Sequence, residues 1–346
     1  MNNLKLKFLV LVCLAGAGLF IFVVKSRHSE TPVKEELKRT SGSSAFDVQI
    51  DEMKSRLKAN PQDIAALVSL SGFYFQSGNY DLSESTFREA LALNEKEVSA
   101  ILGLANVLRY RGRYEESEKM FKTALSLDPK NAWIYIDLGK LYRNWKKYEE
   151  SEKMFAKAIS INPNDDKIYS YGLGYLYRDE GRLEESLKMF QKALELNPSD
   201  FNYMGLGDIY RHLGRYEESE KFLKKSIEMN PQSEAYMGLG YTYLAWNKEA
   251  EAEEAFKDYL EFIKPKSEVY EGLANIYLRQ SRYQEAEEMF KKSLEINPTM
   301  GGYEGLGNLY RAQGKLKEAE EMFRKAVEAN PNHTRARQSL EEIRSQ

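Results

Sequence analysis

The sequence is poor in the residues that usually build catalytic and metal sites. It has one cysteine, Cys13, and three histidines, His28, His212 and His333, which are far apart along the chain. A single cysteine excludes an intrachain disulfide framework, and such scattered histidines predict neither a metal cluster nor a nucleophile–histidine–acid relay. Paired glutamates recur, but in the pattern of solvated helix faces. We therefore expect a protein that is not an enzyme and has no cofactor.

An excess of positive charge is also missing. The formal net charge is -3, and the first 40 residues hold seven Lys or Arg against three Glu, so the remainder carries a net charge of -7. Binding to nucleic acid depends on cationic contacts with phosphates. Nucleic acid is therefore not an expected partner.

Only one long stretch lacks charge, residues 8–24, which Lys7 and Lys25 flank. As a helix these roughly 17 residues would span about 25 Å, and the flanking lysines could extend towards the headgroups on either side of a ~30 Å hydrocarbon core. We predict a transmembrane signal-anchor helix at 8–24, after a short tail at 1–7 and before a flexible linker at 25–44. A signal peptide cleaved near Ala15-Gly16-Ala17 is the alternative. The expected location is the membrane, in a single-pass arrangement whose orientation the Lys and Arg distribution leaves open.

Most of the remaining chain repeats one pattern every 33 to 35 residues, of which Tyr303-Glu-Gly-Leu-Gly-Asn-Leu-Tyr-Arg311 is the clearest copy. A small residue, here termed the anchor, follows a leucine in each copy. An aromatic residue follows the anchor by three positions in seven of eight copies, and Phe follows it by sixteen positions in all but one. The anchors are Ser71, Ala105, Gly139, Gly174, Gly207, Gly240, Ala274 and Gly307. A fixed period of this size indicates a repeat array.

Each copy predicts two helices. Large apolar residues four before, one before and three after the anchor lie on one face of a helix with 3.6 residues per turn. A break follows, in most copies at a glycine, and the second helix begins with acidic residues, which suit its positive end, and usually stops at Asn-Pro or Asp-Pro. Each unit is therefore expected to form an antiparallel helix pair that stacks on the next.

An aromatic residue, Leu-Gly, Tyr, Gly, Ala, Phe and Pro at these spacings resemble the tetratricopeptide repeat family, over about residues 64 to 332. The resemblance implies an all-α fold, an α-solenoid that winds as a right-handed superhelix of about eight helix-turn-helix repeats. The expected repeats are 64–97, 98–131, 132–166, 167–199, 200–232, 233–266, 267–299 and 300–332, between capping helices at 45–60 and 333–346.

Glycine recurs two positions before the anchor, in the middle of the first helix. A glycine there costs about 1 kcal/mol relative to alanine, so its repetition needs a physical reason. One reason is close packing against the neighbouring repeat, and the other is a bare backbone track open to a ligand. The glycines are Gly103, Gly172, Gly205, Gly238, Gly272 and Gly305.

The first helices also carry polar and aromatic residues away from the buried stripe. Arginine stands four positions after the anchor in five units, on the same helix face as the residue one position after it. The resemblance implies that this face lines a concave groove, where arginines would suit an acidic or carboxylate-bearing peptide. The alternative is that each arginine pairs with an acid of the adjacent repeat. The candidate partner-binding residues are Asn106, Arg109, Trp133, Lys140, Arg143, Tyr171, Tyr175, Arg178, Asp208, Arg211, Tyr241, Asn275, Asn308 and Arg311, with the ring of Phe201 beside them.

Two repeats depart from the pattern. Repeat three carries one additional residue, which we place at Asn164-Asp165-Asp166, and repeat six has Tyr259 where others have alanine. A larger side chain at a close helix crossing would force the helices apart. The alternative is that both changes are ordinary sequence drift.

The sequence thus predicts a membrane-anchored scaffold or adaptor without enzymatic activity. It would bind a peptide or helical segment of a protein partner in the groove and support assembly of a membrane or envelope complex. A polysaccharide stacked on the aromatic residues during export or envelope biogenesis is the alternative ligand. Self-association is left open.

Overall fold

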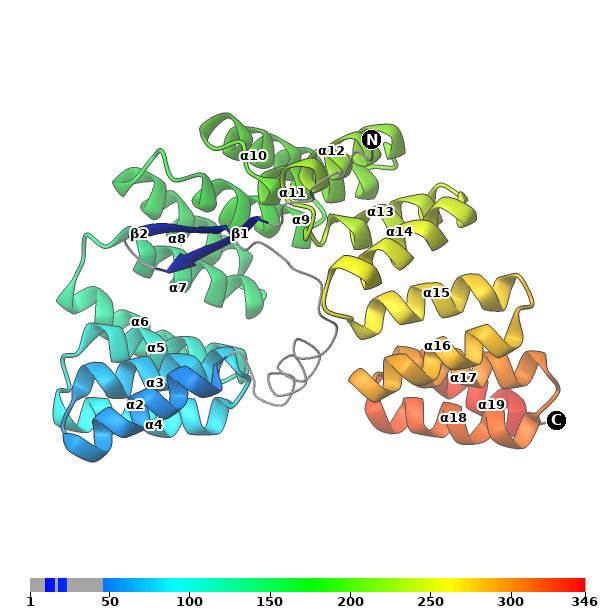
Figure 1. Ribbon diagram of the computed structural model, residues 1–346, viewed down its shortest axis with the longest axis horizontal. Helices are drawn as coiled ribbons and strands as arrows, with labels where there is room; N and C mark the ends of the chain where they lie inside the picture. The colour runs from blue at the N-terminus through cyan, green and yellow to red at the C-terminus, as the bar shows by residue number, and fades with distance from the viewer. Residues whose placement is uncertain (1–9, 16–17, 24–45, 346) are drawn as a thin grey trace, which may run out of the picture. The chain divides into compact units, whose positions relative to one another are not determined.

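The computed structural model describes residues 10–15, 18–23 and 46–345 (Figure 1). The tail predicted at 1–7 and the linker predicted at 25–44 lie outside the described residues.

Two antiparallel strands replace the helix that we predict at 8–24. Strand β1 (Val10–Ala15) pairs with β2 (Gly18–Val23), with Val10 opposite Val23 and Ala15 opposite Gly18. The strands are rich in β-branched and aromatic residues, which favour strands over helices, and the glycines of this stretch disfavour a helix further. Across the part of the chain that the structure describes, no helix combines the length and the apolar composition needed to cross a bilayer. The prediction of a single-pass membrane protein is therefore wrong on this structure.

Residues 46–345 form eighteen α-helices and one π-helical segment, η1. Their bounds are α2 (Asp47–Ala59), α3 (Ile64–Gln76), α4 (Tyr80–Leu93), α5 (Val98–Tyr110), α6 (Tyr114–Leu127), α7 (Ala132–Asn144), α8 (Tyr148–Ile161), η1 (Ile168–Gly174), α9 (Tyr175–Asp179), α10 (Leu183–Leu196), α11 (Asp200–His212), α12 (Tyr216–Met229), α13 (Ala235–Ala245), α14 (Glu249–Phe262), α15 (Ser267–Arg279), α16 (Tyr283–Ile296), α17 (Met300–Ala312), α18 (Leu316–Ala329) and α19 (Thr334–Arg344). The predicted all-α repeat fold is confirmed for this part of the chain, whereas the boundaries drawn between repeats stay a prediction.

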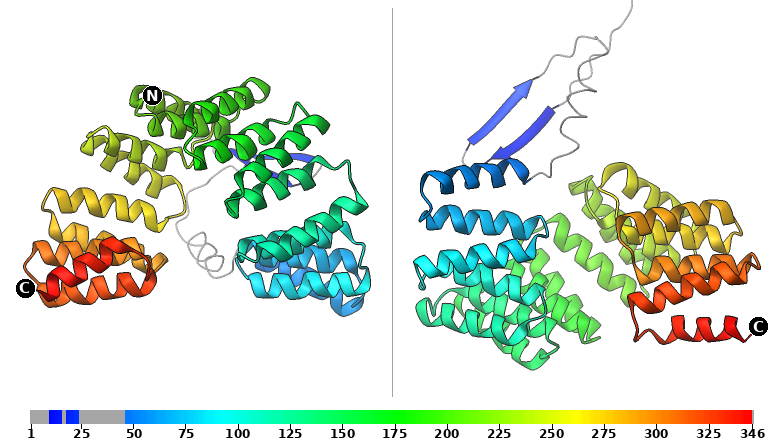
Figure 2. Two further views of the ribbon diagram at one scale, coloured as in Figure 1. Left: turned by 180° about the vertical axis from the view of Figure 1, so that it is seen from behind. Right: turned by 90° about the horizontal axis from the view of Figure 1, so that it is seen from below.

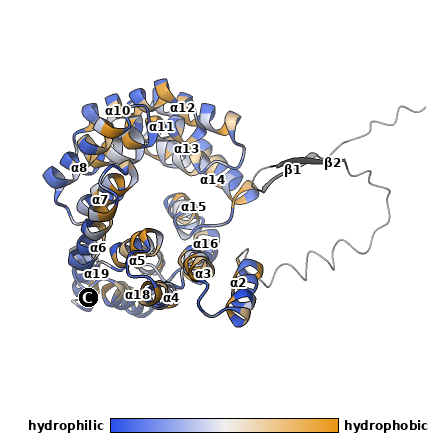
Figure 3. Ribbon diagram, turned by 90° about the vertical axis from the view of Figure 1, so that its left-hand side faces the viewer, coloured by the Kyte–Doolittle hydropathy of each residue, from blue (hydrophilic) through white to orange (hydrophobic). Residues whose placement is uncertain are grey.

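The chain divides into two compact units, residues 1–107 and 108–346. In the first, α3 packs against both α2 and α4, around a core that includes Ile50, Met53 and Leu70. In the second, consecutive helices pack as antiparallel pairs such as α7 with α8 and α11 with α12 (Figure 2). Helix α19 covers the last pair through contacts with α18. Hydrophilic and hydrophobic residues both occur on helices such as α8, α10 and α12 (Figure 3), as expected for helices with one buried face.

Close contact with a phenylalanine explains the repeated glycines. The ring of Phe190 in α10 is fully buried between Gly174 of its own repeat and Gly205 of the next. A Cβ atom added to Gly205 would lie 2.2 Å from Cε1 of Phe190, and one added to Gly174 would lie 2.8 Å from Cε2. These distances are far shorter than van der Waals contact, so the glycines are required by packing between repeats and do not form an open backbone track.

A tyrosine–glutamate hydrogen bond joins the first helix of one repeat to the second helix of the preceding repeat. The Tyr177 hydroxyl donates to Oε1 of Glu152 at 2.6 Å, and Tyr142 donates to Glu118 at the same distance. Burial raises the pKa of Tyr177 to about 12, and the hydrogen bond to the Glu152 carboxylate is the second cause of this shift. The aromatic residue three positions after the anchor therefore contributes a polar link as well as a ring to the core.

We expect Tyr177→Phe to lower the free energy of unfolding by about 1 to 2 kcal/mol, because the ring stays in place while the hydrogen bond to a charged acceptor is lost. Urea denaturation followed by circular dichroism measures this difference. Tyr210→Phe is the matched control, since no hydrogen bond from the Tyr210 hydroxyl is found within residues 46–345. Equal losses in the two variants would show that the ring alone stabilises the repeat.

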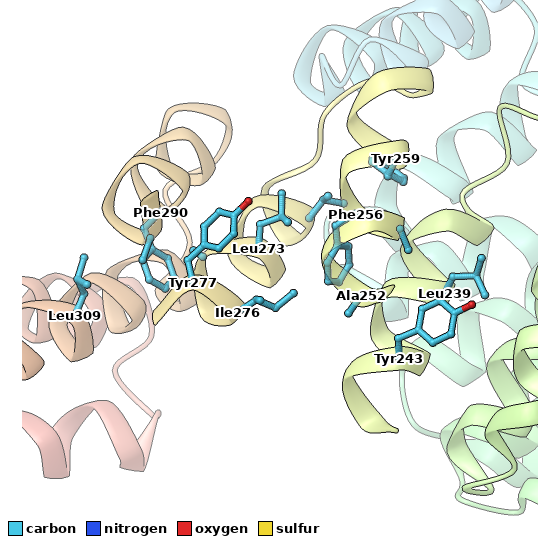
Figure 4. Close-up of a cluster of buried hydrophobic side chains, with 14 of the residues drawn as sticks. Leu239, Tyr243, Ala252, Phe256, Tyr259, Leu273, Ile276, Tyr277, Phe290 and Leu309 are labelled. Carbon is cyan, nitrogen blue, oxygen red and sulfur yellow. The ribbon is translucent and has the colours of Figure 1, made fainter. Parts of the chain in front are cut away.

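Repeat six has the largest fully buried side chain, Tyr259 in α14. It belongs to a buried cluster that extends from α12 to α17 and includes Phe256, Leu273 and Phe290 (Figure 4). Its hydroxyl finds no hydrogen-bond partner among the described residues, and burial raises its pKa to about 12. The tyrosine is therefore accommodated in the core, and the expectation that it forces the helices apart stays a prediction.

Candidate functional site

The additional residue of the repeat array lies inside a helix. This differs from the position at 164–166 that we predict from the sequence. The Tyr135 hydroxyl donates to the carbonyl of Pro129 at 3.1 Å, and the Tyr169 hydroxyl makes the same bond to Pro163 at 3.0 Å. The two loops therefore match, residue for residue. The mismatch comes afterwards, in η1, where a π-helical turn takes up one more residue than an α-helical turn.

Burial identifies that residue as Tyr171. Ser170 and Gly172 on either side are buried, and Gly172 packs against Phe155 as the other glycines at this position pack against their own partners. Tyr171 between them is 39% exposed. The π-helical turn therefore pushes this tyrosine out of the regular pattern and onto the surface of the first helices, where the candidate site residues lie.

The displaced tyrosine joins an aromatic cluster. Its ring stacks on Phe201 of α11, with centroids 3.9 Å apart and an interplanar angle of 6°. Tyr175 lies edge-on to both, at 6.2 Å from Tyr171 and 6.1 Å from Phe201, and edge-on to the buried Phe190 at 5.3 Å. Perpendicular and stacked rings at these distances attract one another beyond their apolar burial, so the cluster is a firm platform.

Arg143 of α7 connects the preceding repeat to this platform. Its Nη1 donates to the Tyr171 carbonyl at 2.9 Å, and its Nε lies 3.5 Å from a carboxylate oxygen of Asp179. The guanidinium lies 5.8 Å from the centre of the Tyr175 ring. A π-helical turn disturbs the regular backbone hydrogen bonds, so a donor at this carbonyl supports the unusual backbone.

Asp208 of α11 joins the next two arginines. It accepts from Nη1 of Arg178 at 3.3 Å and from Nη2 of Arg211. Arg178 also binds Asp179 at 2.9 Å and lies 4.5 Å from the centre of the Tyr175 ring. Three arginines thus share two carboxylates, Asp179 and Asp208. Two further acids, Asp166 and Asp200, lie close enough to Tyr171 to raise the pKa of its hydroxyl, after the larger effect of burial.

Burial perturbs the titration of several groups here. It lowers the pKa of Arg143, against the opposing effect of Asp179, although a guanidinium stays protonated at neutral pH. Burial likewise raises the pKa of the Tyr175 hydroxyl, which is therefore neutral. Burial and the adjacent Arg211 lower the pKa of His212, so the site is not made more positive by that histidine at pH 7.

The structure brings six of the fourteen predicted residues into this one cluster: Arg143, Tyr171, Tyr175, Arg178, Asp208 and Arg211. The other eight lie on first helices outside these contacts. Lys140 pairs with Asp137 at 3.1 Å, and Trp133 is 49% exposed beneath the ammonium group of Lys167. Two of them donate to backbone carbonyls: Asn106 to that of Leu102 and Tyr241 to that of Glu268. The guanidinium of Arg109 lies over the Tyr110 ring. Arg311 binds both Asn308 and Glu342, and Asn275 is exposed.

The alternative considered for the arginines was pairing with an acid of the adjacent repeat. Arg143 and Arg178 pair in this way, and Arg311 pairs with Glu342 of the C-terminal helix α19. Asp179, which bridges Arg143 and Arg178, is not among the residues predicted from the sequence. Its place directly after Arg178 was the available signal. Pairing and ligand binding are compatible, because these arginines keep part of their surface exposed and have further donors.

The comparisons with known proteins agree on the fold. The model of the Cilia and flagella-associated protein 70 C-terminal domain matches residues 170–346, and three tetratricopeptide repeat models match residues 64–97, 97–164 and 137–201. None of these models describes an enzyme family. No curated protein sequence matches the chain.

Three solved structures are similar at low sequence identity. Yeast Tom70 superposes with a TM-score of 0.63 at 17% identity, over 80% of this chain and 59% of that one. The Cut9 and Hcn1 hetero-tetramer of the APC/C gives 0.57 at 15%, over 91% and 60%. A tetratricopeptide repeat protein from Parabacteroides merdae gives 0.54 at 22%, over 68% and 94%. The chain thus spans about 60% of the length of the first two. With the repeat models covering it from residue 64 onwards, this chain belongs to the tetratricopeptide repeat family.

Proposed function

We propose that the protein is a scaffold or adaptor without enzymatic activity. It binds a peptide or helical segment of a protein partner on the cluster formed by Arg143, Tyr171, Tyr175, Arg178 and Arg211. The carrying observation is the π-helical turn that places the ring of Tyr171 on this surface. Such turns inside α-helices are frequent at functional sites.

The chemistry of the cluster suits a peptide that bears a carboxylate. Aromatic rings and arginines are the residues that contribute most energy at protein interfaces, and a guanidinium binds a carboxylate through two parallel hydrogen bonds. Three guanidinium groups share only two carboxylates, Asp179 and Asp208, so the arginines keep donors for a further carboxylate. The similar Cut9 structure contains a second protein, Hcn1, which is consistent with partner binding by this fold.

Polysaccharide binding receives less support. A sugar ring stacks on an open aromatic face, but Tyr171 already stacks on Phe201 at 3.9 Å. The rim of the cluster is also formed by charged guanidinium groups, which suit an anionic segment better than a neutral glycan.

Selection of a random peptide library on the purified full-length chain tests the proposal. We expect the selected peptides to carry Asp or Glu beside an aromatic or large apolar residue. Replacing Arg178 and Arg211 by Gln is expected to weaken their binding about tenfold, while the same change at the exposed Arg324 and Arg337 leaves it within about twofold. Equal effects of the two double variants would contradict binding at this cluster.

A further inference from the structure

Repeat six has a hollow on a different face of α13 from Tyr241. Its volume is about 540 Å³, and residues of α12, α13 and α14 line it. Its apolar part consists of Tyr236, Leu239 and Tyr243 of α13, with Ile227 and Ala255 beside them. All of these residues belong to the second unit and to neighbouring helices that pack directly together.

The preceding repeat shows what fills this place elsewhere. There the Phe222 ring lies beside Tyr210, with centroids 5.3 Å apart and an interplanar angle of 4°, and beside Tyr203 at 6.2 Å. In repeat six the two tyrosines recur as Tyr236 and Tyr243, but the residue equivalent to Phe222 is Ala255. The hollow therefore lies where a large side chain packs in the neighbouring repeat.

Helix α14 also carries acidic residues beside the hollow, where the matching helices of other repeats carry lysines. Two positions before and two positions after the phenylalanine of the second helix, repeats three and four have lysine: Lys153, Lys157, Lys188 and Lys192. Repeat five has Lys221 and Lys225 around Leu223, whereas repeat six has Glu254 and Asp258 around Phe256.

Both acids line the hollow together with Glu251, and no ion pair to any of the three is found within residues 46–345. The two basic residues at the hollow are already engaged: Lys224 pairs with Glu220 at 2.6 Å, and Lys248 lies 3.2 Å from the centre of the Trp246 ring. Burial and the neighbouring acids also raise the pKa of Asp258.

We infer that this hollow is a second binding site, for a segment of a partner protein in which lysine or arginine flanks a side chain of the size of phenylalanine or methionine. The apolar side chain enters between Tyr236 and Tyr243, where Phe222 lies in the preceding repeat. The basic residues pair with Glu254 and Asp258, which are four positions apart and so lie on one face of α14. Loss of the filling side chain and reversal of two charges around one place together form an apolar slot with an acidic wall.

Fluorescence anisotropy with three labelled peptides tests this inference on the full-length protein. The peptides are Gly-Ser-Lys-Lys-Phe-Lys-Lys-Ser-Gly, the same peptide with Glu for every Lys, and the same peptide with Gly for Phe. We expect the first to bind at least about tenfold more tightly than the other two. Ala255→Met fills the hollow with the residue that repeats three and four carry, and Glu254→Lys with Asp258→Lys restores the lysines of repeats three to five. Each change is expected to weaken binding of the first peptide about tenfold.

Glu149→Lys with Glu184→Lys is the matched control, since it makes the same change of net charge at two exposed positions of other repeats, and it should leave the affinity within about twofold. Thermal unfolding checks that each variant is folded, and Ala255→Met should not lower the Tm. If Ala255→Met binds the first peptide as tightly as the unaltered chain, or if the control weakens binding as much as the reversal of Glu254 and Asp258, the inference is overturned. Self-association that Ala255→Met abolishes would assign the hollow to a second copy of the chain and would overturn it as well.

Discussion

Gly205→Ala is expected to lower the free energy of unfolding by about 2 to 3 kcal/mol, although alanine normally stabilises a helix relative to glycine by about 1 kcal/mol. The added methyl group would lie 2.2 Å from Cε1 of Phe190. That ring is fully buried and has Gly174 on its other side, so it has no free space into which to move. The overpacking cost should therefore exceed the gain in helix propensity.

The matched control is Gly72→Ala in α3. A Cβ atom there meets nothing within 4 Å, so the propensity term acts alone and should stabilise the chain by about 1 kcal/mol. Urea denaturation followed by circular dichroism gives both values. Opposite signs for two identical substitutions in first helices would isolate the contribution of the Phe190 contact.

Phe190→Leu should restore part of the stability lost in Gly205→Ala. Repeat five itself carries Leu223 where others have phenylalanine, between Gly207 and Gly238, so the repeat accepts leucine at this place. If Gly205→Ala is as stable as Gly72→Ala, the result would contradict the close contact between Gly205 and the Phe190 ring.

The helix pairs could be predicted from the sequence because the residue pattern that produces them recurs along the chain. An apolar stripe, a break and an acidic start recur in eight copies, so each copy supports the interpretation of the others. The reason for the glycines could not be decided in the same way. A bare backbone track and a tight contact require the same residue, and only the position of the Phe190 ring distinguishes them.

The N-terminal prediction failed because it was based on hydropathy, length and flanking charge, without regard to strand propensity. The length of residues 8–24 and the lysines on either side suit a membrane helix, but strands β1 and β2 have the same apolar composition. Their β-branched and aromatic residues, with Gly16 and Gly18 in the middle of the stretch, were the signal for strands that the prediction gave too little weight.

The contacts within the candidate site could be predicted only in part, and partner binding there stays a prediction. The face of the first helices and six contacting residues follow from the repeat and from helical periodicity, yet the contacts among them depend on where the additional residue lies. A spacing of 35 residues between Gly139 and Gly174 shows that one residue is inserted but not where. A loop is the usual place for an insertion, and this led to the wrong position at 164–166.

Deletion of Tyr171 is expected to remove peptide binding at the cluster while leaving the repeat folded. The deletion gives Ile168–Gly174 the same length as Ile134–Gly139 in the preceding repeat, so η1 and α9 should become one continuous α-helix. The Tyr171 ring and the carbonyl that accepts from Arg143 are then both lost from the surface. Affinity for the library-selected peptides should fall by more than about tenfold, with circular dichroism and Tm close to those of the unaltered chain.

Tyr171→Ala separates the ring from the backbone. This variant keeps the additional residue and therefore the π-helical turn and its bond to Arg143, but it lacks the stack on Phe201. It should lose less affinity than the deletion if the turn also positions Arg143 and Tyr175 for the ligand. Equal losses would mean that the turn acts only by presenting the ring. A deletion variant that is folded and binds the selected peptides as tightly as the unaltered chain would remove the observation on which the proposed function rests.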